Sequence, residues 1–598
     1  MASYGELDAP KVIVAIDFGT TFSGFSYIHV QSGTIDHENL LDNVQKNASR
    51  DAEYELKGWG WEALVEYKIL LEKSGNADNL DGKRFHYITK FKLALAGSKH
   101  HDDSPGESYR LPEGFEVERV IADYLHQLSI EAEKDLQKTN PGLLQISRKD
   151  IQWCLTIPAI WNDSAKQQME ICAQKANLIS GPSNTSGAGS PHPLVTVLEP
   201  EAASAYCMLK YTNQAGLIAG SKILVVDLGG GTVDLVFHEK VSSTVGCHRV
   251  KETCNGGSGA LCGGTYVDEA FEELLSTKIN CYKTFISEYP SAIFKIQSTW
   301  ENIKLAFDGE LGPYEFTIPT QLSDYWKNYN QEKGLHTPNS KYGDLIFTLQ
   351  EMKNVFDRAV NPILKLIADQ LAVGGSEDVH ALLLVGGFSG CEYVSNTVRK
   401  QFGKFGKFGS KVKRIIKPTH PGKATVTGAI AHGIASNAIV TSRKLRKTYG
   451  VAVFNGRNKS GELNDCKFCV LAREGDEVAV DQCIKQKFCR AEWEELISVK
   501  RDPSMFFEVF STKDSDPKLV TDKGTNLECT HMFTIPCLDE KPWVEVSVFL
   551  GKSIIKLTAK GVNFKSEIEV LPLITLDAEP LKQAAYSRRK VVPMLGLS

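Results

Sequence analysis

Two short segments place an aspartate, glycines and threonines at the spacing that binding of a triphosphate requires. They are IDFGTTFSG at residues 16–24 and DLGGGTVD at residues 227–234. Glycine lets the backbone approach anionic oxygens, and consecutive N–H groups form an anion-binding nest beside the threonine hydroxyls. Asp17, which ends the strand before the first segment's glycine, can hold Mg²⁺ mainly through water. Asp227 and Asp234 flank the glycines of the second segment. The two segments together therefore predict a phosphate and magnesium site.

Each segment also has a purely structural interpretation. Residues 16–24 alone fit an ordinary glycine turn between two strands. In residues 227–234, three consecutive glycines carry a cost in conformational entropy that a simple turn does not require, unless another group must approach the backbone. The occurrence of both segments in one chain therefore favours the interpretation as a binding site. The chain has no Gly-x-x-x-x-Gly-Lys-Ser/Thr motif, and no Gly-x-Gly-x-x-Gly opens a helix after a strand. P-loop proteins are thereby excluded, and a dinucleotide-binding fold is disfavoured.

The elements that must position these loops follow the same pattern twice. An apolar, β-branched run ends at each loop, and a second run returns after it, which is typical of buried strands. This recurrence predicts an α/β fold with two related lobes and a cleft between them. The expected strand units are residues 11–18, 24–31, 151–158, 222–238 and 381–390, and the expected helices are residues 58–72, 116–139 and one from about Ser164, with Asn162 or Asp163 as its cap.

Changes in sequence texture divide the chain into five parts. Residues 1–10 are expected to be a disordered start, and residues 11–440 to hold the two lobes. A basic linker follows at residues 441–448. Short alternating apolar runs broken by turn residues predict a mainly β domain at residues 449–575, before a tail at residues 576–598.

Composition excludes several classes of protein. The net charge of −5 over 598 residues gives no global basic field that would attract nucleic acid or anionic lipid. No apolar run approaches the roughly 20 residues of a membrane helix, and the polar N-terminus lacks the layout of a signal peptide. We therefore expect a cytoplasmic protein, with the nucleus as the alternative, whose 14 cysteines are reduced thiols.

Seven motifs in a fixed order resemble the ATPase domain of the seventy-kilodalton heat-shock protein family. The resemblance covers about residues 11–440, and the chain resembles the divergent branch called heat shock 70 kDa protein 12. It implies an actin-like (ribonuclease H-like) two-lobed ATPase domain that binds ATP or ADP with Mg²⁺. The motifs are IDFGTTFSG, LTIPAIWND, VLEPEAASAY, VVDLGGGTVD, CGGTYVDEAF, WENIKLAF and LLLVGGFSG.

The resemblance assigns a role to each matching residue. Lys92, Glu199, Asp227 and Thr232 would be catalytic, and Asp17 and Asp227 would hold Mg²⁺ mainly through water. Lys92 would stabilise the charge that develops during phosphoryl transfer, although Lys90 is a rival for that position. The implied nucleotide-binding residues are Asp17, Gly19, Thr20, Thr21, Phe22, Gly229, Gly230, Gly231, Asp234, Gly263, Gly264, Glu301, Lys304, Gly386, Gly387 and Phe388.

The chain departs from the family in two places. On the adenosine side, Leu305 replaces the arginine that follows the matching lysine, and Gly390 replaces the arginine that stacks on the base, so Phe388 offers either a new stacking surface or a core side chain. In the C-terminal half, SRKLRK at residues 442–447 replaces the apolar linker, and no long helical lid follows the β domain. Phosphate binding is thus the firmer expectation, and coupling to the C-terminal half the weaker one.

Three functions fit these features. The first is a slowly ATP-hydrolysing, stress-related chaperone-like protein, with extended polypeptide clients and co-chaperones as partners and no binding of nucleic acid. The second is a nucleotide-sensing interaction protein with little turnover. The third is a small-metabolite kinase, which the segment LTIPAIWND and the closing Asp234 disfavour.

Two weaker signals remain outside these functions. Cys466 and Cys469, followed by Cys483 and Cys489, have a zinc-like pattern but a poor spacing, so buried structural cysteines are the favoured interpretation. The segment KQFGKFGKFGSKVKRIIK at residues 400–417 is basic with interleaved phenylalanines. A solvated loop is the favoured interpretation there, and contact with nucleic acid is the alternative.

Overall fold

The computed structural model forms two compact units. The first comprises Met1–Ile160, Glu170–His248 and Ser258–Ile439, and the second comprises Trp161–Met169, Arg249–Gly257 and Val440–Ser598. The structure describes residues 9–30, 44–45, 48–50, 56–74, 86–95, 111–112, 114–139, 146–181, 189–242, 249–253, 257–335, 343–374, 378–409, 411–435, 439–453, 466–490, 504–534, 543–562, 570–573 and 594–596. The expected start at 1–10 and tail at 576–598 therefore lie outside the described residues, apart from 9–10 and 594–596.

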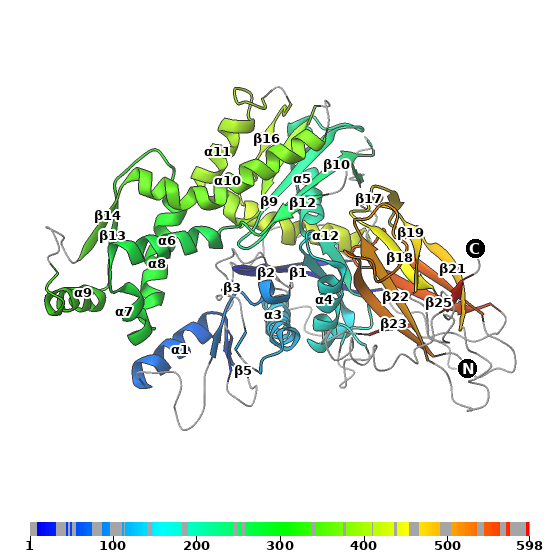
Figure 1. Ribbon diagram of the computed structural model, residues 1–598, viewed down its shortest axis with the longest axis horizontal. Coiled ribbons are helices and arrows are strands. Elements are labelled where there is room, and N and C mark those ends of the chain that lie inside the picture. The colour runs from blue at the N-terminus through cyan, green and yellow to red at the C-terminus, as the bar shows by residue number, and fades with distance from the viewer. Residues whose placement is uncertain are drawn as a thin grey trace. The chain divides into compact units, whose positions relative to one another are not determined.

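A first sheet in unit 1 carries the first glycine loop, and its strand order is β3-β2-β1-β7-β8. Figure 1 labels its strands β1, β2 and β3. Strand β1 is buried along nearly its whole length because its run VIVAI is apolar on both faces. It is antiparallel to β2 and parallel to β7, and β7 is parallel to β8. The strands are β1 (Val12–Phe18), β2 (Phe22–His29), β3 (Val44–Gln45), β7 (Ile151–Ile157) and β8 (Val195–Leu198).

Aromatic packing fixes the end of β1, where the first loop begins. The ring of Tyr124, on helix α3 (Val117–Thr139), lies 5.8 Å from that of Phe18 and 5.6 Å from that of Phe91. Phe18 precedes the glycine loop, and Phe91 precedes the short helix α2 (Lys92–Leu95). The neighbouring elements are β4 (Ala48–Arg50), β5 (Leu56–Trp59), β6 (His86–Ile88), α1 (Gly60–Ser74), the 3-10 turn η3 (Arg148–Asp150) and α4 (Asp163–Lys175).

A second sheet, also in unit 1, carries the second glycine loop. Strand β9 (Lys222–Leu228) is antiparallel to β10 (Val233–Lys240) across the loop and parallel to β15 (Ala381–Val385). Strand β15 is parallel to β16 (Ile415–Ile416), and β12 (Ser258–Ala260) pairs with β10. Both loops thus join two antiparallel strands at the end of a buried apolar strand, as the repeated sequence pattern predicts.

Several helices and a two-stranded antiparallel sheet of β13 and β14 follow the second sheet's strand β12 along the chain. The stacked rings of Phe271 on α6 and Trp300 on α8, 3.7 Å apart, join two of these helices. No helix within the described residues has the length and apolar character to cross a membrane. The elements are α6 (Thr265–Lys278), α7 (Tyr282–Glu288), α8 (Ala292–Ala306), β13 (Tyr314–Thr317), α9 (Thr320–Glu332), β14 (Asp344–Phe347), α10 (Leu349–Val373), η4 (Gly387–Gly390), α11 (Glu392–Phe402) and η5 (Pro421–Lys423).

Two helices of small residues cross closely beside the first sheet. A Cβ on Gly428, in α12 (Ala424–Ile434), would lie 1.7 Å from the carbonyl oxygen of Ala202, in α5 (Glu199–Ala215). Only glycine permits this approach, so the contact with α12 fixes the position of α5 beside the sheet. The first residue of α5 is Glu199, and the crossing therefore sets the position of that carboxylate.

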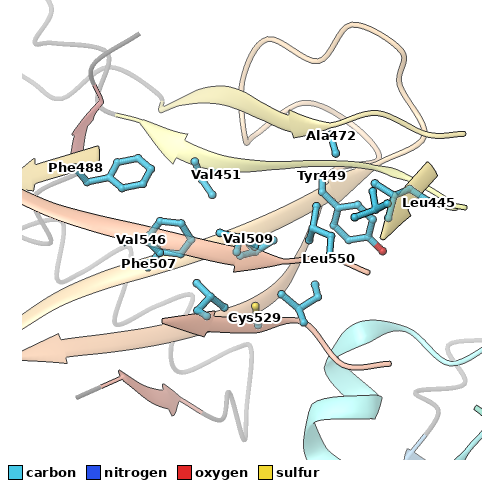
Figure 2. Packing of buried hydrophobic residues seen from close by; sticks show 14 of the residues in the cluster. Leu445, Tyr449, Val451, Ala472, Phe488, Phe507, Val509, Cys529, Val546 and Leu550 are labelled. Atoms are coloured by element: carbon cyan, nitrogen blue, oxygen red, sulfur yellow. The ribbon is translucent and has the colours of Figure 1, made fainter. Parts of the chain in front are cut away.

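Unit 2 contains two β-sheets that share one core. Their strand orders are β19-β18-β22-β23-β26 and β25-β24-β21-β27, and β17 pairs with β20. Figure 2 shows Val451, Phe507 and Val509 of the first sheet near Phe488 and Val546 of the second, all at most 1% exposed. The strands are β11 (Val250–Glu252), β17 (Ser442–Lys444), β18 (Thr448–Val453), β19 (Lys467–Ala472), β20 (Glu477–Ala479), β21 (Ile484–Arg490), β22 (Ser504–Thr512), β23 (Asn526–Thr534), β24 (Trp543–Phe549), β25 (Lys556–Gly561), β26 (Val570–Leu573) and β27 (Met594–Gly596).

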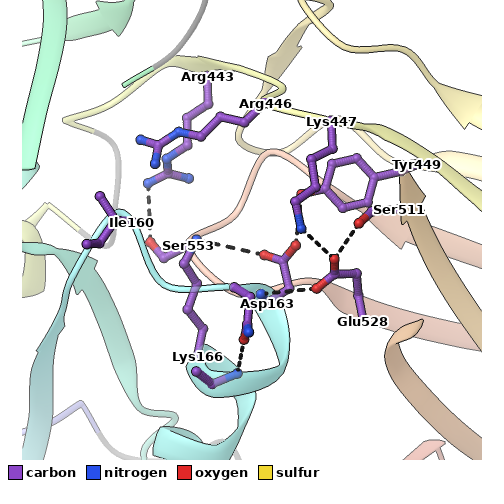
Figure 3. Close-up of polar contacts among 12 residues, drawn as sticks. Ile160, Asp163, Lys166, Arg443, Arg446, Lys447, Tyr449, Ser511, Glu528 and Ser553 are labelled. Carbon is purple, nitrogen blue, oxygen red and sulfur yellow. Dashed lines mark hydrogen bonds and ion pairs between the residues drawn. The ribbon is translucent and has the colours of Figure 1, made fainter. Parts of the chain in front are cut away.

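A buried polar network in unit 2 centres on Glu528 (Figure 3). Its carboxylate accepts hydrogen bonds from Lys447 Nζ (2.6 Å), from the hydroxyl of Ser511 and from the backbone N–H of Asp163 (3.3 Å). Tyr449 Oη in turn donates to Asp163 Oδ2 at 2.8 Å. Asp163 is thus held by strand β18 and by Glu528. Asn162 is the residue that caps α4, because its Oδ1 accepts from the N–H of Ala165 at 2.7 Å.

Candidate functional site

The two glycine loops meet, and the contact requires glycine. The first loop is Gly19–Thr21, and the second is Gly229–Thr232. A Cβ on Gly230 would lie 2.4 Å from Thr21 Oγ1, and one on Gly231 would lie 2.8 Å from Thr20 Oγ1. Any larger residue would push the loops apart. The structure therefore brings the two predicted phosphate loops together.

Short-range contacts fix the shape of each loop. In the first, a Cβ on Gly19 would lie 2.1 Å from the carbonyl oxygen of Phe22, whose own side chain is exposed. In the second, the N–H of Gly229 donates to the carbonyl of Thr232 at 2.9 Å. These contacts leave the loops little freedom, as a pre-organised anion site requires.

A second glycine pair supports the second loop from the start of helix α6. The N–H of Gly264 donates to the carbonyl of Gly229 (3.2 Å), and the N–H of Thr265 donates to that of Gly230 (2.8 Å). A Cβ on Gly263 would lie 2.5 Å from those same two carbonyl oxygens. Gly263 and Gly264 thus support the second glycine loop through its backbone.

Four carboxylates and a lysine gather beside the loops. Lys92 Nζ donates to Glu199 Oε1 at 2.6 Å, and Lys92 is only 2% exposed. Asp227 and Asp234 are direct partners across β9 and β10, so their side chains lie on the same face of the sheet. Asp17 and Asp234 both interact electrostatically with Glu199, so the acids of the cluster are close enough to affect one another's charge state.

Burial and repulsion from neighbouring carboxylates raise the pKa of two acids in this cluster, Glu199 and Asp227. Burial is the main cause that raises the pKa of Glu199 to about 7, although Lys92 lowers it, and Asp17 and Asp234 add to the rise. Burial also raises the pKa of Asp227 well above its usual value, followed by repulsion from Glu199, Asp234 and Asp17. Such a cluster favours the approach of positive charge.

The two candidate lysines have different surroundings. Lys92 is buried, and its ammonium group lies 5.7 Å from the centre of the Phe18 ring as well as against Glu199. Lys90 has a positive φ of 54° and lies 3.9 Å from Glu269, on helix α6. Lys92 is therefore the lysine that the structure places in the carboxylate cluster.

Two hydrogen-bond donors that hold aspartates of the cluster were not predicted from the sequence. Thr156 Oγ1 donates to Asp17 Oδ1 at 2.7 Å, and the backbone N–H of Ile160 donates to Asp234 Oδ1 at 2.8 Å. Both lie in LTIPAIWND, which was recognised as a motif without a role for either residue. Only the pairing of β7 beside β1 brings Thr156 to Asp17.

On the side expected to hold adenosine, Lys304 is held by two acids. Its Nζ lies 2.6 Å from Glu301 Oε2 and 2.8 Å from Asp268 Oδ1, and Trp300 Nε1 also donates to Asp268. Burial lowers the pKa of Lys304, but the two carboxylates raise it by more than burial lowers it. The net pKa is therefore above its usual value, and the side chain stays charged. Asp268 escaped prediction, and Leu305 is 58% exposed.

The glycine turn after β15 connects the two sides of the site. Gly386 has φ 84°, and a Cβ there would lie 2.3 Å from Asp227 Oδ1. Two residues on, the ring of Phe388 packs beside Gly264 and is 8% exposed. The backbone of Gly387 lies against Gly422. Phe388 is thus mostly covered by its own chain rather than presented as an open stacking surface.

Within the described residues, no three His, Cys, Asp or Glu side chains are close enough to chelate a metal ion directly. The carboxylates of the cluster are hard oxygen donors, which Mg²⁺ prefers, and Mg²⁺ commonly keeps several of its waters. The donor set therefore fits a hydrated Mg²⁺ ion better than a directly chelated one.

Known proteins match this chain over most of its length. Residues 82–412, more than half of the chain, match the family described as Hsp70 protein. Heat shock 70 kDa protein 12A of Homo sapiens is 25% identical over 661 residues, covering 94% of this chain and 91% of its own. Heat shock 70 kDa protein 12B of Homo sapiens is 25% identical and covers 81% of this chain and 78% of its own. Chaperone protein dnaK3 of Synechocystis sp. is 28% identical over 49% of this chain and 34% of its own.

Proposed function

The chain belongs to the Hsp70 family, whose ATPase domain is an actin-like, two-lobed α/β fold, and from this premise we propose that it slowly hydrolyses ATP with Mg²⁺ and holds extended polypeptides. It is a nucleotide-binding protein of the Hsp70 type. Hydrolysis and polypeptide binding are the proposal. The observation that carries it is the buried pair of Lys92 and Glu199, set among Asp17, Asp227 and Asp234.

The residues fit ATP and Mg²⁺ on two grounds. The glycines of the second loop let it pack directly against the threonine hydroxyls of the first, because a Cβ on Gly230 or Gly231 would lie 2.4 or 2.8 Å from those hydroxyl oxygens. The neighbouring carboxylates raise the pKa of Glu199 and Asp227, so a positive charge between these acids would be stabilised. Bound Mg²⁺ would supply positive charge against the phosphate oxygens.

The proposal gives each group a positioning or electrostatic task. Thr20, Thr21 and the loop N–H groups would hold the phosphates, and Asp17 and Asp227 would hold the waters of Mg²⁺. Lys92 is a buried cation that would face the charge that develops during transfer. Glu199 fixes the direction of the Lys92 side chain through their 2.6 Å contact. Thr232, which is 4% exposed, would direct its hydroxyl to the terminal phosphate.

Adenosine would be held mainly by the α8 side of the site. Glu301 and Lys304, one turn apart on that helix, are the polar groups we propose for the ribose and base. Leu305 and Phe388 would replace the family's arginine contacts with apolar surface. Selectivity for adenine is therefore expected to be weaker than the binding of the phosphates.

The C-terminal unit is proposed to be a reduced, mainly β domain for polypeptides or partner proteins. Its own core, shared by two sheets, supports a separate function. We further propose the domain limits 11–440 and 449–575, with 441–448 between them. The cytoplasmic location stays a prediction.

Single-turnover hydrolysis of ATP by the purified protein and by Asp227→Asn tests the enzyme. The variant keeps the volume of the side chain but removes its charge and replaces one acceptor oxygen with an NH₂ donor, so we expect at least a ~100-fold lower rate. Binding of nucleotide is measured separately, since a loss of binding alone would not assign a role in the reaction.

Equal rates in the two proteins would refute this role of Asp227. A wild-type protein that binds ATP without turnover would instead be a nucleotide-sensing interaction protein, and one that phosphorylates a sugar would be a kinase.

A further inference from the structure

The segment after helix α11 gathers positive charge on one loop. Arg399, Lys400, Lys404 and Lys407 are all exposed. Within the part of the chain that the structure describes, Lys400, Lys404 and Lys407 form no ion pair, whereas the more distant Lys413 pairs with Asp378. Their charge is therefore available to a partner, even though the whole chain is negative.

Glycines at every third position fold this loop into a compact series of turns. The N–H of Gly406 donates to the carbonyl of Gly403 (2.8 Å), and the N–H of Gly409 donates to that of Gly406 (3.0 Å). A Cβ on Gly403, Gly406 or Gly409 would lie within 2.4 Å of a backbone carbonyl oxygen. The glycines are thus a requirement of the turns, and the turns fix where the intervening side chains point.

The three phenylalanines of the loop differ in their environments. Phe402 is buried, and its ring lies 5.2 Å from that of Phe408, so these two pack on each other. Phe405 is 97% exposed, whereas the next most exposed large hydrophobic residue among those described, Leu311, is 72% exposed. Lys404 Nζ lies 5.7 Å from the centre of the Phe405 ring. The loop therefore presents one bare aromatic ring between lysines.

We propose that residues 399–409 are a docking surface for a membrane that bears anionic lipids. Phe405 would enter the boundary between headgroups and acyl chains, where aromatic rings are favoured. Lys400, Lys404 and Lys407 would lie against the anionic headgroups, each adding attraction within a Debye length of the surface. The chemistry is that of a peripheral contact, an apolar anchor combined with a basic patch.

The arrangement favours a lipid surface over single-stranded nucleic acid. Nucleic-acid grooves combine a basic track with several rings on which successive bases stack. Here Phe402 and Phe408 already pack on each other, which leaves a single presented ring. One projecting ring flanked by lysines matches a flat anionic surface that accepts one apolar anchor.

Binding of the full-length protein to sedimented vesicles tests the proposal. The vesicles are phosphatidylcholine alone and phosphatidylcholine with phosphatidylserine, at low and high salt. The test variants are Phe405→Ser and the pair Lys404→Glu with Lys407→Glu. The matched control is Lys327→Glu with Lys333→Glu, two exposed lysines at α9 with the same change in charge.

We expect binding only to vesicles that contain phosphatidylserine, with loss of binding at high salt. Each test variant should weaken the apparent affinity by about tenfold or more, while the control should bind as the wild type does. An unchanged midpoint of thermal unfolding would show that the variants are folded, as their exposed positions lead us to expect.

The proposal is overturned if the wild type ignores phosphatidylserine, or if either test variant binds as tightly as the control. It is also overturned if a single-stranded oligonucleotide binds through Lys404 and Lys407 while the vesicles do not.

Discussion

Burial of charge is the main physical feature of the site at the scale of single residues. A buried ammonium group needs a close anionic partner, and Lys92 has one in Glu199 at 2.6 Å. Asp17, Asp227 and Asp234 then leave the site with more negative than positive charge. The result is a high pKa for Glu199 and Asp227 in the nucleotide-free protein.

This shift predicts how stability depends on pH. The pKa of Glu199 is about 7 in the folded protein and near 4.5 in an unfolded chain. Between these values the folded protein binds more protons, so the contribution of Glu199 to stability is fully present below about pH 4.5 and is lost as the pH rises through about 7. The thermal midpoint of the nucleotide-free protein should therefore fall across this window, and less steeply in Glu199→Gln.

Thermal unfolding of both proteins at a series of pH values measures the effect. Identical slopes for the wild type and Glu199→Gln would show that Glu199 is not the titrating group.

The charged residues of the site could be predicted from the sequence more readily than the residues that hold them in place. Asp17 and Asp227 lie at the ends of apolar strands, where a local motif makes them recognisable in the sequence. Thr156 and Asp268 act through contacts over long sequence separations, with Asp17 and Lys304, and no local pattern shows such contacts. The choice between Lys90 and Lys92 also depended on which side chain turns inward.

At the scale of elements, the strands that carry the loops were predictable because their apolar runs are continuous. Strands β1, β7 and β9 all follow the predicted ranges, and so do helices α1 and α3. The unit to which a segment belongs was not predictable. Trp161–Met169 belongs to unit 2, where Tyr449 and Glu528 bind Asp163, although its sequence indicated the end of the motif LTIPAIWND and the capped start of a helix.

The close contact of the two glycine loops gives a prediction at this scale. Gly230→Ala would place a methyl group 2.4 Å from Thr21 Oγ1, so the loops must separate. The strain of overpacking should lower the affinity for ATP about tenfold or more. Titration calorimetry measures it.

Gly24→Ala is the matched control, since a Cβ there meets nothing within 4 Å. Equal affinities for ATP in the two variants would mean that the contact between the loops does not shape the phosphate site.

At the scale of the whole molecule, the chain combines an Hsp70 ATPase domain with a unit that has its own β core. Residues 442–444, in the segment predicted as a linker, form strand β17 and pair with β20. Arg443 also contacts Gly551 and Ser553 of the same unit. Residues 442–444 of the basic segment are thus held in a strand within unit 2.

The proposed polypeptide binding predicts a dependence on nucleotide. A fluorescent unfolded peptide should bind the ADP-loaded protein at least about fivefold more tightly than the ATP-loaded protein, as coupling between two sites requires. Fluorescence anisotropy measures both affinities.

Gly230→Ala serves as the control, because ATP should no longer weaken peptide binding at concentrations that saturate only the wild type. Absence of peptide binding with either nucleotide would leave unit 2 as a partner surface without a client site.

The central claim is that the buried pair of Lys92 and Glu199 drives ATP hydrolysis. Single-turnover hydrolysis by the wild type, Lys92→Met and Lys90→Met, with Mg²⁺ and saturating enzyme, tests it most directly. We predict a measurable rate for the wild type, a rate at least ~100-fold lower for Lys92→Met, and a rate close to the wild type for Lys90→Met. Equal rates for Lys92→Met and the wild type, or no turnover by the wild type at all, would contradict the claim.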